Sequence, residues 1–194
     1  MTDLGLLNLC HVGIAVPSIE EFTRTWGALL NVPGWLVKEI EQPAGLLQLH
    51  GERQGPSRSR IAMARLADTA IELVEPLEGH TRTSAWLETR GPGIHHLAFW
   101  VADLDRAVAA LADHADITYS PAARRSPDSP GGPVSAVARG RGPLPLGHQA
   151  QDPGFWLYAE PRGPQASWCL ELLDARRADV VREAFGDHIV YPSS

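Results

Sequence analysis

The chain has 194 residues, which is enough for one compact domain or for two small fused modules. Hydrophobic residues make up 44% of it and charged residues 21%, as in an ordinary globular protein, and its formal net charge of −6 argues against nucleic-acid binding. Because there is no membrane-length apolar stretch and no signal-peptide pattern, we expect a cytoplasmic protein without a membrane partner. We expect its two cysteines, Cys10 and Cys169, to be free thiols.

The first predicted elements are a strand over residues 11–16 and a helix after Ser18. Large apolar residues alternate in the strand with small ones, so His11 and Gly13 are expected to share one face. Ser18 is followed by acidic residues and is a candidate N-cap. Three apolar side chains at helical spacing form the expected buried stripe: Ile19, Phe22 and Trp26.

The same pattern returns 85 residues later, which indicates an internal repeat. A strand over residues 96–101 is followed by Asp103, a second candidate N-cap. The alignment pairs His96 with His11. Because neighbouring residues of a regular strand point to opposite faces, it also predicts that His95 lies on the other, apolar face. The second helix has its own buried stripe: Leu104, Val108 and Leu111.

Each copy ends in a predicted hairpin, over residues 59–76 and 155–175. Their last strands, "IELVEP" and "LELLDA", match and set Glu72 against Glu171. The chain is therefore expected to consist of two βαβββ modules that form one functional domain. We place these modules at residues 1–88 and 89–194, joined through a short helix around residues 84–89.

The second module is longer because it contains a loop over residues 121–154 that is rich in proline, glycine and arginine. Two interpretations stay open for this loop. It is either a surface excursion or a lid whose arginines meet an anionic group of a ligand.

The repeat gives four polar residues equivalent places on inward faces. Two imidazoles and two carboxylates form a competent site for a divalent metal, and two inward carboxylates would repel without a cation between them. The predicted metal ligands are His11, Glu72, His96 and Glu171.

The segments "HVGIAV", "IELVEP", "HHLAFWV" and "LELLD" resemble the vicinal-oxygen-chelate superfamily, which includes glyoxalase I, methylmalonyl-CoA epimerase, extradiol dioxygenases and bleomycin-resistance proteins. The resemblance covers nearly the whole chain except residues 121–154 and the tail after Asp174. It implies an α+β fold in which paired βαβββ modules form a partly closed, barrel-like sheet with helices packed outside. It also implies a metal held by the first and last strands of each module, and a homodimer.

Within the superfamily, "SAWLETRGPGIHHLAF" looks most like the epimerase branch, although Glu72 stands where epimerases usually carry Gln and glyoxalase I carries Glu. The resemblance implies a divalent-metal-dependent isomerase or lyase that acts through a metal-stabilised enolate of a small carbonyl or acyl-thioester substrate. Catalytic candidates are Glu72, Glu171 and Glu41, and Trp100 is a candidate substrate contact. The metal stays open among Zn, Ni, Co, Mn, Mg and Fe.

Two alternatives stay open. An Fe(II)-dependent dioxygenase, ring-cleaving or other, usually offers two histidines and one carboxylate, and a fourth ligand at Glu72 takes up a position that such enzymes leave open. A non-enzymatic protein that binds a small molecule such as an antibiotic commonly lacks the metal residues, whereas this chain keeps all four matching positions.

Overall fold

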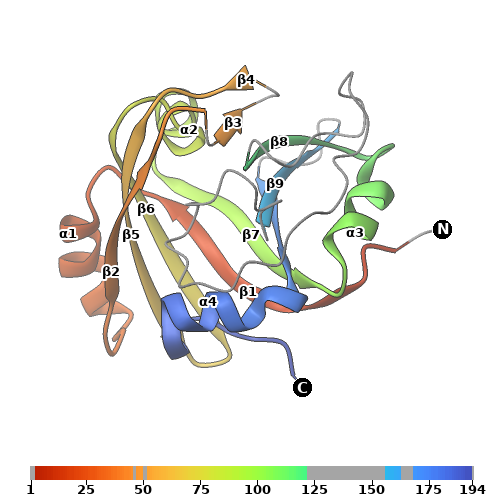
Figure 1. The fold of residues 1–194 in the computed structure, drawn as a ribbon. Helices are drawn as coiled ribbons and strands as arrows, with labels where there is room; N and C mark the ends of the chain where they lie inside the picture. The colour runs from red at the N-terminus through yellow and green to blue at the C-terminus, as the bar shows by residue number, and fades with distance from the viewer. Residues whose placement is uncertain (1–2, 46, 50–51, 122–155, 163–167, 194) are drawn as a thin grey trace.

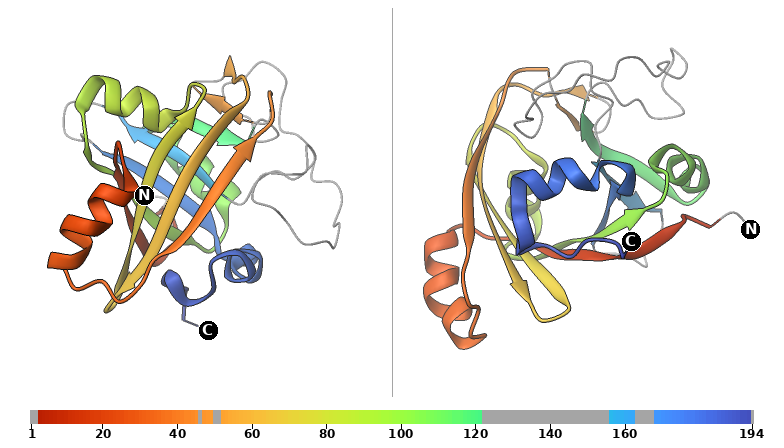
Figure 2. Two further views of the ribbon diagram at one scale, coloured as in Figure 1. Left: turned by 90° about the vertical axis from the view of Figure 1, so that its left-hand side faces the viewer. Right: turned by 60° about the horizontal axis from the view of Figure 1, so that its bottom comes forward.

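The computed structural model describes residues 3–45, 47–49, 52–121, 156–162 and 168–193. They form a mixed α+β fold built on one ten-stranded sheet, which curls around a concave side without closing into a barrel (Figures 1 and 2). This confirms the predicted fold class. The predicted loop lies outside the described residues from position 122 onward. No helix in the described ranges is long and apolar enough to cross a membrane.

The strands are β1 (Leu6–Ala15), β2 (Leu36–Gln42), β3 (Leu47–Leu49), β4 (Glu52–Arg53), β5 (Ser57–Leu66), β6 (Thr69–Glu78), β7 (Gly93–Val101), β8 (Ala115–Pro121), β9 (Trp156–Pro161) and β10 (Cys169–Asp174). The α-helices are α1 (Ile19–Phe22), α2 (Arg82–Arg90), α3 (Leu104–Leu111) and α4 (Ala178–Phe185). A π-helical turn, η1 (Thr23–Gly27), follows α1. Two 3₁₀ turns flank α4, η2 (Ala175–Arg177) and η3 (Gly186–His188).

The strand order is β2-β5-β6-β1-β7-β10-β9-β8-β3-β4. β1 pairs in parallel with β6, β7 pairs in parallel with β10, and the two four-stranded halves meet where β1 runs antiparallel to β7. The short strands β3 and β4 depart from this symmetry, because β3 pairs with β8 at the far edge of the other half. The expected module boundary after residue 88 falls inside α2.

Both predicted N-caps are present. The side chain of Ser18 accepts a hydrogen bond from the backbone N–H of Glu21 at 3.1 Å, and that of Asp103 accepts one from the N–H of Arg106 at 3.0 Å. Such caps satisfy N–H groups that have no partner inside the helix. The sequence therefore marks both helix starts correctly.

The predicted buried stripe of the first helix is correct at Ile19 and wrong at Trp26, whose exposed fraction is 59%. The reason is the π-helical turn over Thr23–Gly27, which contains Trp26. A π-helix turns through a smaller angle per residue than an α-helix, so the side chains that follow leave the buried face. The stripe of α3 is regular, and Leu104 and Leu111 are buried as predicted.

Helices α1 and α3 pack on the outer face of the sheet, whereas α4 lies across its concave side (Figure 2). Val181 and Phe185, four residues apart on α4, pack into the same core cluster as Ile61 and Met63 of β5. The tail after Asp174 therefore completes the interior of the protein.

Trp100 anchors this tail. Its side chain is fully buried, its Nε1–H donates to the backbone oxygen of Val190 at 2.7 Å, and its ring lies 5.9 Å from that of Tyr191. The predicted role of Trp100 as a substrate contact is not supported, because the C-terminal tail covers the indole.

We expect Trp100→Phe to lower the free energy of unfolding by about 1–3 kcal/mol, because the partly buried oxygen of Val190 loses its donor while most of the ring packing remains. Urea denaturation followed by circular dichroism measures this change. An unaltered midpoint would show that the tail does not depend on the Trp100–Val190 hydrogen bond.

Candidate metal centre

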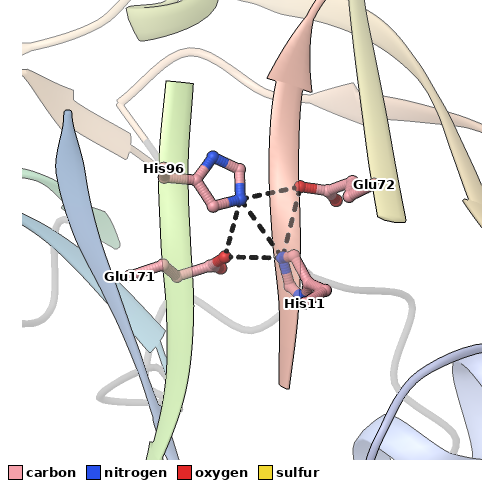
Figure 3. A group of neighbouring side chains, drawn as sticks. All are labelled: His11, Glu72, His96 and Glu171. Carbon is pink, nitrogen blue, oxygen red and sulfur yellow. Dashed lines mark hydrogen bonds and ion pairs between the residues drawn. The ribbon is translucent and has the colours of Figure 1, made fainter. Parts of the chain in front are cut away.

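The four predicted ligands come from four adjacent strands at the middle of the sheet, β6, β1, β7 and β10. Their side chains converge on the concave side (Figure 3), and all four residues are buried. Their ligand atoms lie within 4.8 Å of one another. The residues are His11, Glu72, His96 and Glu171.

The strand register explains this convergence. Gly13 of β1 has Glu72 beside it on β6 and His96 beside it on β7. Ala98 of β7 has His11 on one side and Glu171 on the other. The four ligands thus form two rows, and each row has a small residue at its centre.

Glycine is required at the centre of the first row. The imidazole of His96 lies directly over Gly13, and a Cβ added to this glycine would stand 1.9 Å from the ring atom Cε1. Gly13 therefore shares the inward face with His11, as the sequence predicts, and the space that it leaves is filled by the ring of a ligand histidine.

The two imidazoles face each other and both carboxylates. The Nε2 atoms of His11 and His96 are 3.1 Å apart. Oε2 of Glu171 lies 3.0 Å from Nε2 of His11 and 3.2 Å from that of His96, and the corresponding distances from Oε2 of Glu72 are 3.5 and 3.1 Å.

Burial and mutual contact shift the pKa values of all four groups. Burial opposes the charged form of each histidine, but contact with Cys10 and with both carboxylates holds the pKa of His11 well above 6.5, and the carboxylates also raise that of His96. Burial likewise opposes ionisation of Glu72 and Glu171, but hydrogen bonds from the histidines lower both carboxyl pKa values. These contacts therefore favour the imidazolium form of both histidines and the carboxylate form of both glutamates.

The donor set fits a divalent cation. Two protonated Nε2 atoms at 3.1 Å would point their hydrogens at each other, and Oε2 of Glu171 is buried without a hydrogen bond of good geometry. Ligand atoms around a tetrahedral zinc ion stand roughly 3.3–3.6 Å apart, close to the distances found here. One divalent cation in place of two protons would also leave the total charge of the buried cluster unchanged.

The prediction that His95 lies on the opposite face from His96 is wrong. The pairing of β1 with β7 moves from Gly13–His96 to Ile14–Ile94, so His95 is an extra residue in a β-bulge. The bulge turns the His95 side chain to the same side, and its Nδ1 lies 2.8 Å from Nδ1 of His96. Period-two alternation holds only for a regular strand.

A cavity of about 120 Å³ adjoins the cluster and is lined by His11, Glu72 and Glu171. Strands β5, β6 and β10 and helix α4 supply its apolar wall, which includes Ile61, Met63, Val74, Leu173, Val181 and Phe185. The sequence signal for the part of this wall that α4 supplies is the four-residue spacing of Val181 and Phe185. The superfamily resemblance gives no such signal, because it ends before this tail.

The start of α2 supplies the polar part of the cavity lining, Thr81, Arg82 and Thr83. Arg82 is buried, donates to Glu160 at 2.5 Å and contacts the thiol of Cys169, which is free like that of Cys10. Sequence reasoning missed this arginine, because only the fold shows that it is buried.

Glu41 does not join the site. β2 alternates between the two faces of the sheet, so Ile40 and Gln42 line the cavity while Glu41 is exposed on the other face. Neither Glu41 nor Trp100 is among the described residues that line the cavity.

The family model of the Glyoxalase/Bleomycin resistance protein/Dioxygenase superfamily matches residues 10–128, more than half of the chain. The chain belongs to this superfamily. The resemblance seen in the sequence is thereby confirmed. The matched range includes three of the four candidate ligands, and Glu171 lies beyond it.

An uncharacterised protein of Bacillus subtilis, YqjC, is 30% identical over 106 residues, which are 55% of this chain and 66% of that protein, slightly under two thirds of its length. The hypothetical protein BH1468 from Bacillus halodurans has a similar solved structure, with 18% identity, a TM-score of 0.48, and coverage of 86% of this chain and 93% of that one. The solved structure of methylmalonyl-CoA epimerase from Mycobacterium tuberculosis shows 18% identity and a TM-score of 0.46. The match covers 88% of this chain and 89% of that one. The superfamily assignment rests on the family model.

We expect Gly13→Ala to weaken Zn²⁺ binding at least about tenfold, because the added methyl group displaces the ring of His96. Isothermal titration calorimetry measures the affinity. Gly93→Ala is the matched control on β7, since a Cβ at Gly93 meets nothing within 4 Å. Equal affinities of the two variants would contradict the packing of His96 over Gly13.

We expect metal affinity to rise with pH through the raised pKa values of His11 and His96, because metal and protons compete for Nε2. The stability of the metal-free protein should change in the opposite direction. Folding raises both pKa values above 6.5, so this stabilisation is complete below pH 6.5 and is lost as the pH rises through the folded values. Zn²⁺ titrations and urea denaturation from pH 5.5 to 8.5 measure the metal affinity and the stability of the metal-free protein. If both rose with pH, the raised pKa values of His11 and His96 would be contradicted.

Proposed function

We propose that the protein is a divalent-metal-dependent isomerase or lyase that removes a proton next to the carbonyl of a small carbonyl or acyl-thioester substrate. One observation carries the proposal: two imidazole nitrogens and two carboxylate oxygens converge beside a cavity that is large enough for a small molecule. Membership of the superfamily supports an enzymatic role, because the superfamily includes glyoxalases and dioxygenases, which are enzymes.

The residues that would hold the metal are His11, Glu72, His96 and Glu171. A bound divalent cation would supply Lewis-acid polarisation of the substrate carbonyl. Glu72 and Glu171 line the cavity, and their lowered pKa values keep both carboxylates ionised near neutral pH. The contacts with both imidazoles that lower these pKa values also weaken the carboxylates as bases, so a carboxylate becomes an effective acceptor for a proton from a substrate carbon when those contacts are released.

The lining of the cavity supports this substrate class. Thr81, Arg82 and Thr83 offer hydrogen-bond donors to substrate oxygens, while the wall formed by α4 and the sheet offers an apolar surface to the carbon atoms of a substrate. A small molecule with an apolar part and a carbonyl or carboxyl oxygen matches both surfaces. The homodimer stays an expectation from the superfamily resemblance, and the cytoplasmic location stays a prediction from the sequence.

The number of protein ligands favours this chemistry over the two alternatives. An Fe(II) oxygenase with two histidines and one carboxylate keeps positions free for oxygen and substrate, and a fourth protein ligand occupies one of them. A protein that only sequesters a small molecule has no need for two buried carboxylates beside two histidines, an arrangement that is costly to bury without a cation.

The decisive experiment measures metal content and proton exchange on the same protein. We expect protein purified without chelator to contain one divalent ion per chain. In D₂O it should exchange a hydrogen on the carbon next to the ketone or thioester carbonyl of at least one member of a panel of 2-oxo acids and 2-substituted acyl-CoA thioesters. NMR follows this exchange. Glu72→Gln and Glu171→Gln should slow this exchange by about 10²–10⁴-fold.

Glu41→Gln is the matched control, because Glu41 is an exposed carboxylate of the same half of the sheet and lies outside the cavity. Its exchange rate should equal that of the unsubstituted protein. Protein without a divalent ion would contradict the proposal, and so would iron accompanied by oxygen consumption. Loss of exchange in Glu41→Gln but not in Glu72→Gln would move the base to the outer face.

A further inference from the structure

Two β-bulges occupy equivalent places in the repeat. The pairing of β1 with β7 moves from Leu9–Phe99 to His11–Ala98, which leaves Cys10 as an extra residue, and from Gly13–His96 to Ile14–Ile94, which leaves His95 as an extra residue. In both halves the extra residue directly precedes a candidate ligand histidine.

Each bulge places a side chain against the Nδ1 atom of the histidine that follows. Sγ of Cys10 lies 3.3 Å from Nδ1 of His11, and Nδ1 of His95 lies 2.8 Å from Nδ1 of His96. In a regular strand these neighbours would point to opposite faces. The bulges thus provide both ligand histidines with a partner on the side away from the cluster.

The hydrogen positions follow from the geometry. A neutral imidazole carries one N–H, so a histidine that coordinates metal through Nε2 carries its hydrogen on Nδ1 and needs an acceptor there. Between the Nδ1 atoms of His95 and His96 there is room for one hydrogen only. If His96 donates it, His95 is the acceptor and carries its own hydrogen on Nε2.

We propose that Cys10 and His95 are positioning residues that accept hydrogen bonds from Nδ1 of His11 and His96 and so direct both Nε2 atoms toward the metal. This inference rests on the proposed function, because it concerns the same metal. His95 is the stronger of the two acceptors, since a thiol sulfur accepts hydrogen bonds weakly.

The surroundings of His95 fit this role. Its side chain is 1% exposed, and its ring stands edge-on to Trp86 of α2 at 5.0 Å and to Tyr158 of β9 at 5.7 Å. Its Nε2 is buried and has no hydrogen-bond partner among the described residues, a cost to stability that packing alone does not explain. Among the described residues, the His95 ring makes one polar contact, which joins its Nδ1 to Nδ1 of His96.

Substitution of His95 separates hydrogen bonding from packing. His95→Phe keeps a ring between Trp86 and Tyr158 but removes the acceptor, whereas Oδ1 of His95→Asn occupies about the place of Nδ1. We expect His95→Phe to weaken Zn²⁺ binding by about 10–100-fold, measured by competition with a chromogenic chelator. His95→Asn should retain most of the affinity, although its smaller side chain packs less well.

Cys10 offers an independent pair. Cys10→Ser keeps an acceptor atom beside Nδ1 of His11 and Cys10→Ala removes it. We expect the alanine variant to bind Zn²⁺ more weakly than the serine variant, by a smaller factor than separates His95→Phe from His95→Asn. Thermal unfolding of the metal-free variants checks that each is folded.

An NMR measurement on the unsubstituted protein needs no substitution. In ¹⁵N-histidine-labelled, Zn²⁺-loaded protein, we expect His96 to carry its hydrogen on Nδ1 and His95 to carry its hydrogen on Nε2. A His95 hydrogen on Nδ1, or equal Zn²⁺ affinity of His95→Phe and the unsubstituted protein, would overturn the inference and leave the metal site standing. If the unsubstituted protein binds no Zn²⁺ or other divalent ion, the proposed function fails and this inference fails with it.

Discussion

The antiparallel contact between β1 and β7 determines the geometry of the candidate metal centre. It joins the two halves of the sheet and sets Gly13 opposite His96 and Ala98 opposite His11. The parallel partners β6 and β10 then add one glutamate to each row. A slip of this pairing by one residue would turn the ligands to the other face, so the whole centre depends on one strand register.

The same arrangement has an electrostatic cost, because it buries four ionisable groups close together. Four ionisable groups are buried with their ligand atoms within 4.8 Å, although burial opposes the charged form of every one of them. Contact with partners of the opposite sign favours the charged form of each group. The two negative charges of the carboxylates are neutralised either by two protons on the histidines or by one divalent cation. A single proton or a monovalent cation would leave a net buried charge.

Much of this architecture could be predicted from the sequence, because it follows from a repeat. His96 is the repeat equivalent of His11, and Glu171 is that of Glu72. This equivalence identified four residues that the fold brings together. Both helix N-caps were also local signals, since a single side chain at the right position satisfies the first backbone N–H groups. Repeats and caps are visible in a chain without knowledge of its tertiary contacts.

What could not be predicted depends on irregular backbone and on contacts between distant segments. A bulge brings His95 beside His96, and a π-helical turn exposes Trp26. The apolar pattern of the strand carries no mark of the bulge, and that of the helix carries no mark of the π-helical turn. The burial of Arg82 against Cys169 and the closure of the cavity by α4 join segments far apart in the chain, and only the folded sheet brings them together.

The two rows of ligands also bear on how such a site can arise. Each row combines a histidine from one half of the chain with a glutamate from the other, so neither half contains a complete row. A half-length ancestor with one histidine and one glutamate would have assembled all four ligands only by pairing two copies through their first strands. Gene duplication and fusion would then preserve a site that lies between two chains and would let each half change separately, which agrees with the different residues, Cys10 and His95, at equivalent places in the two bulges.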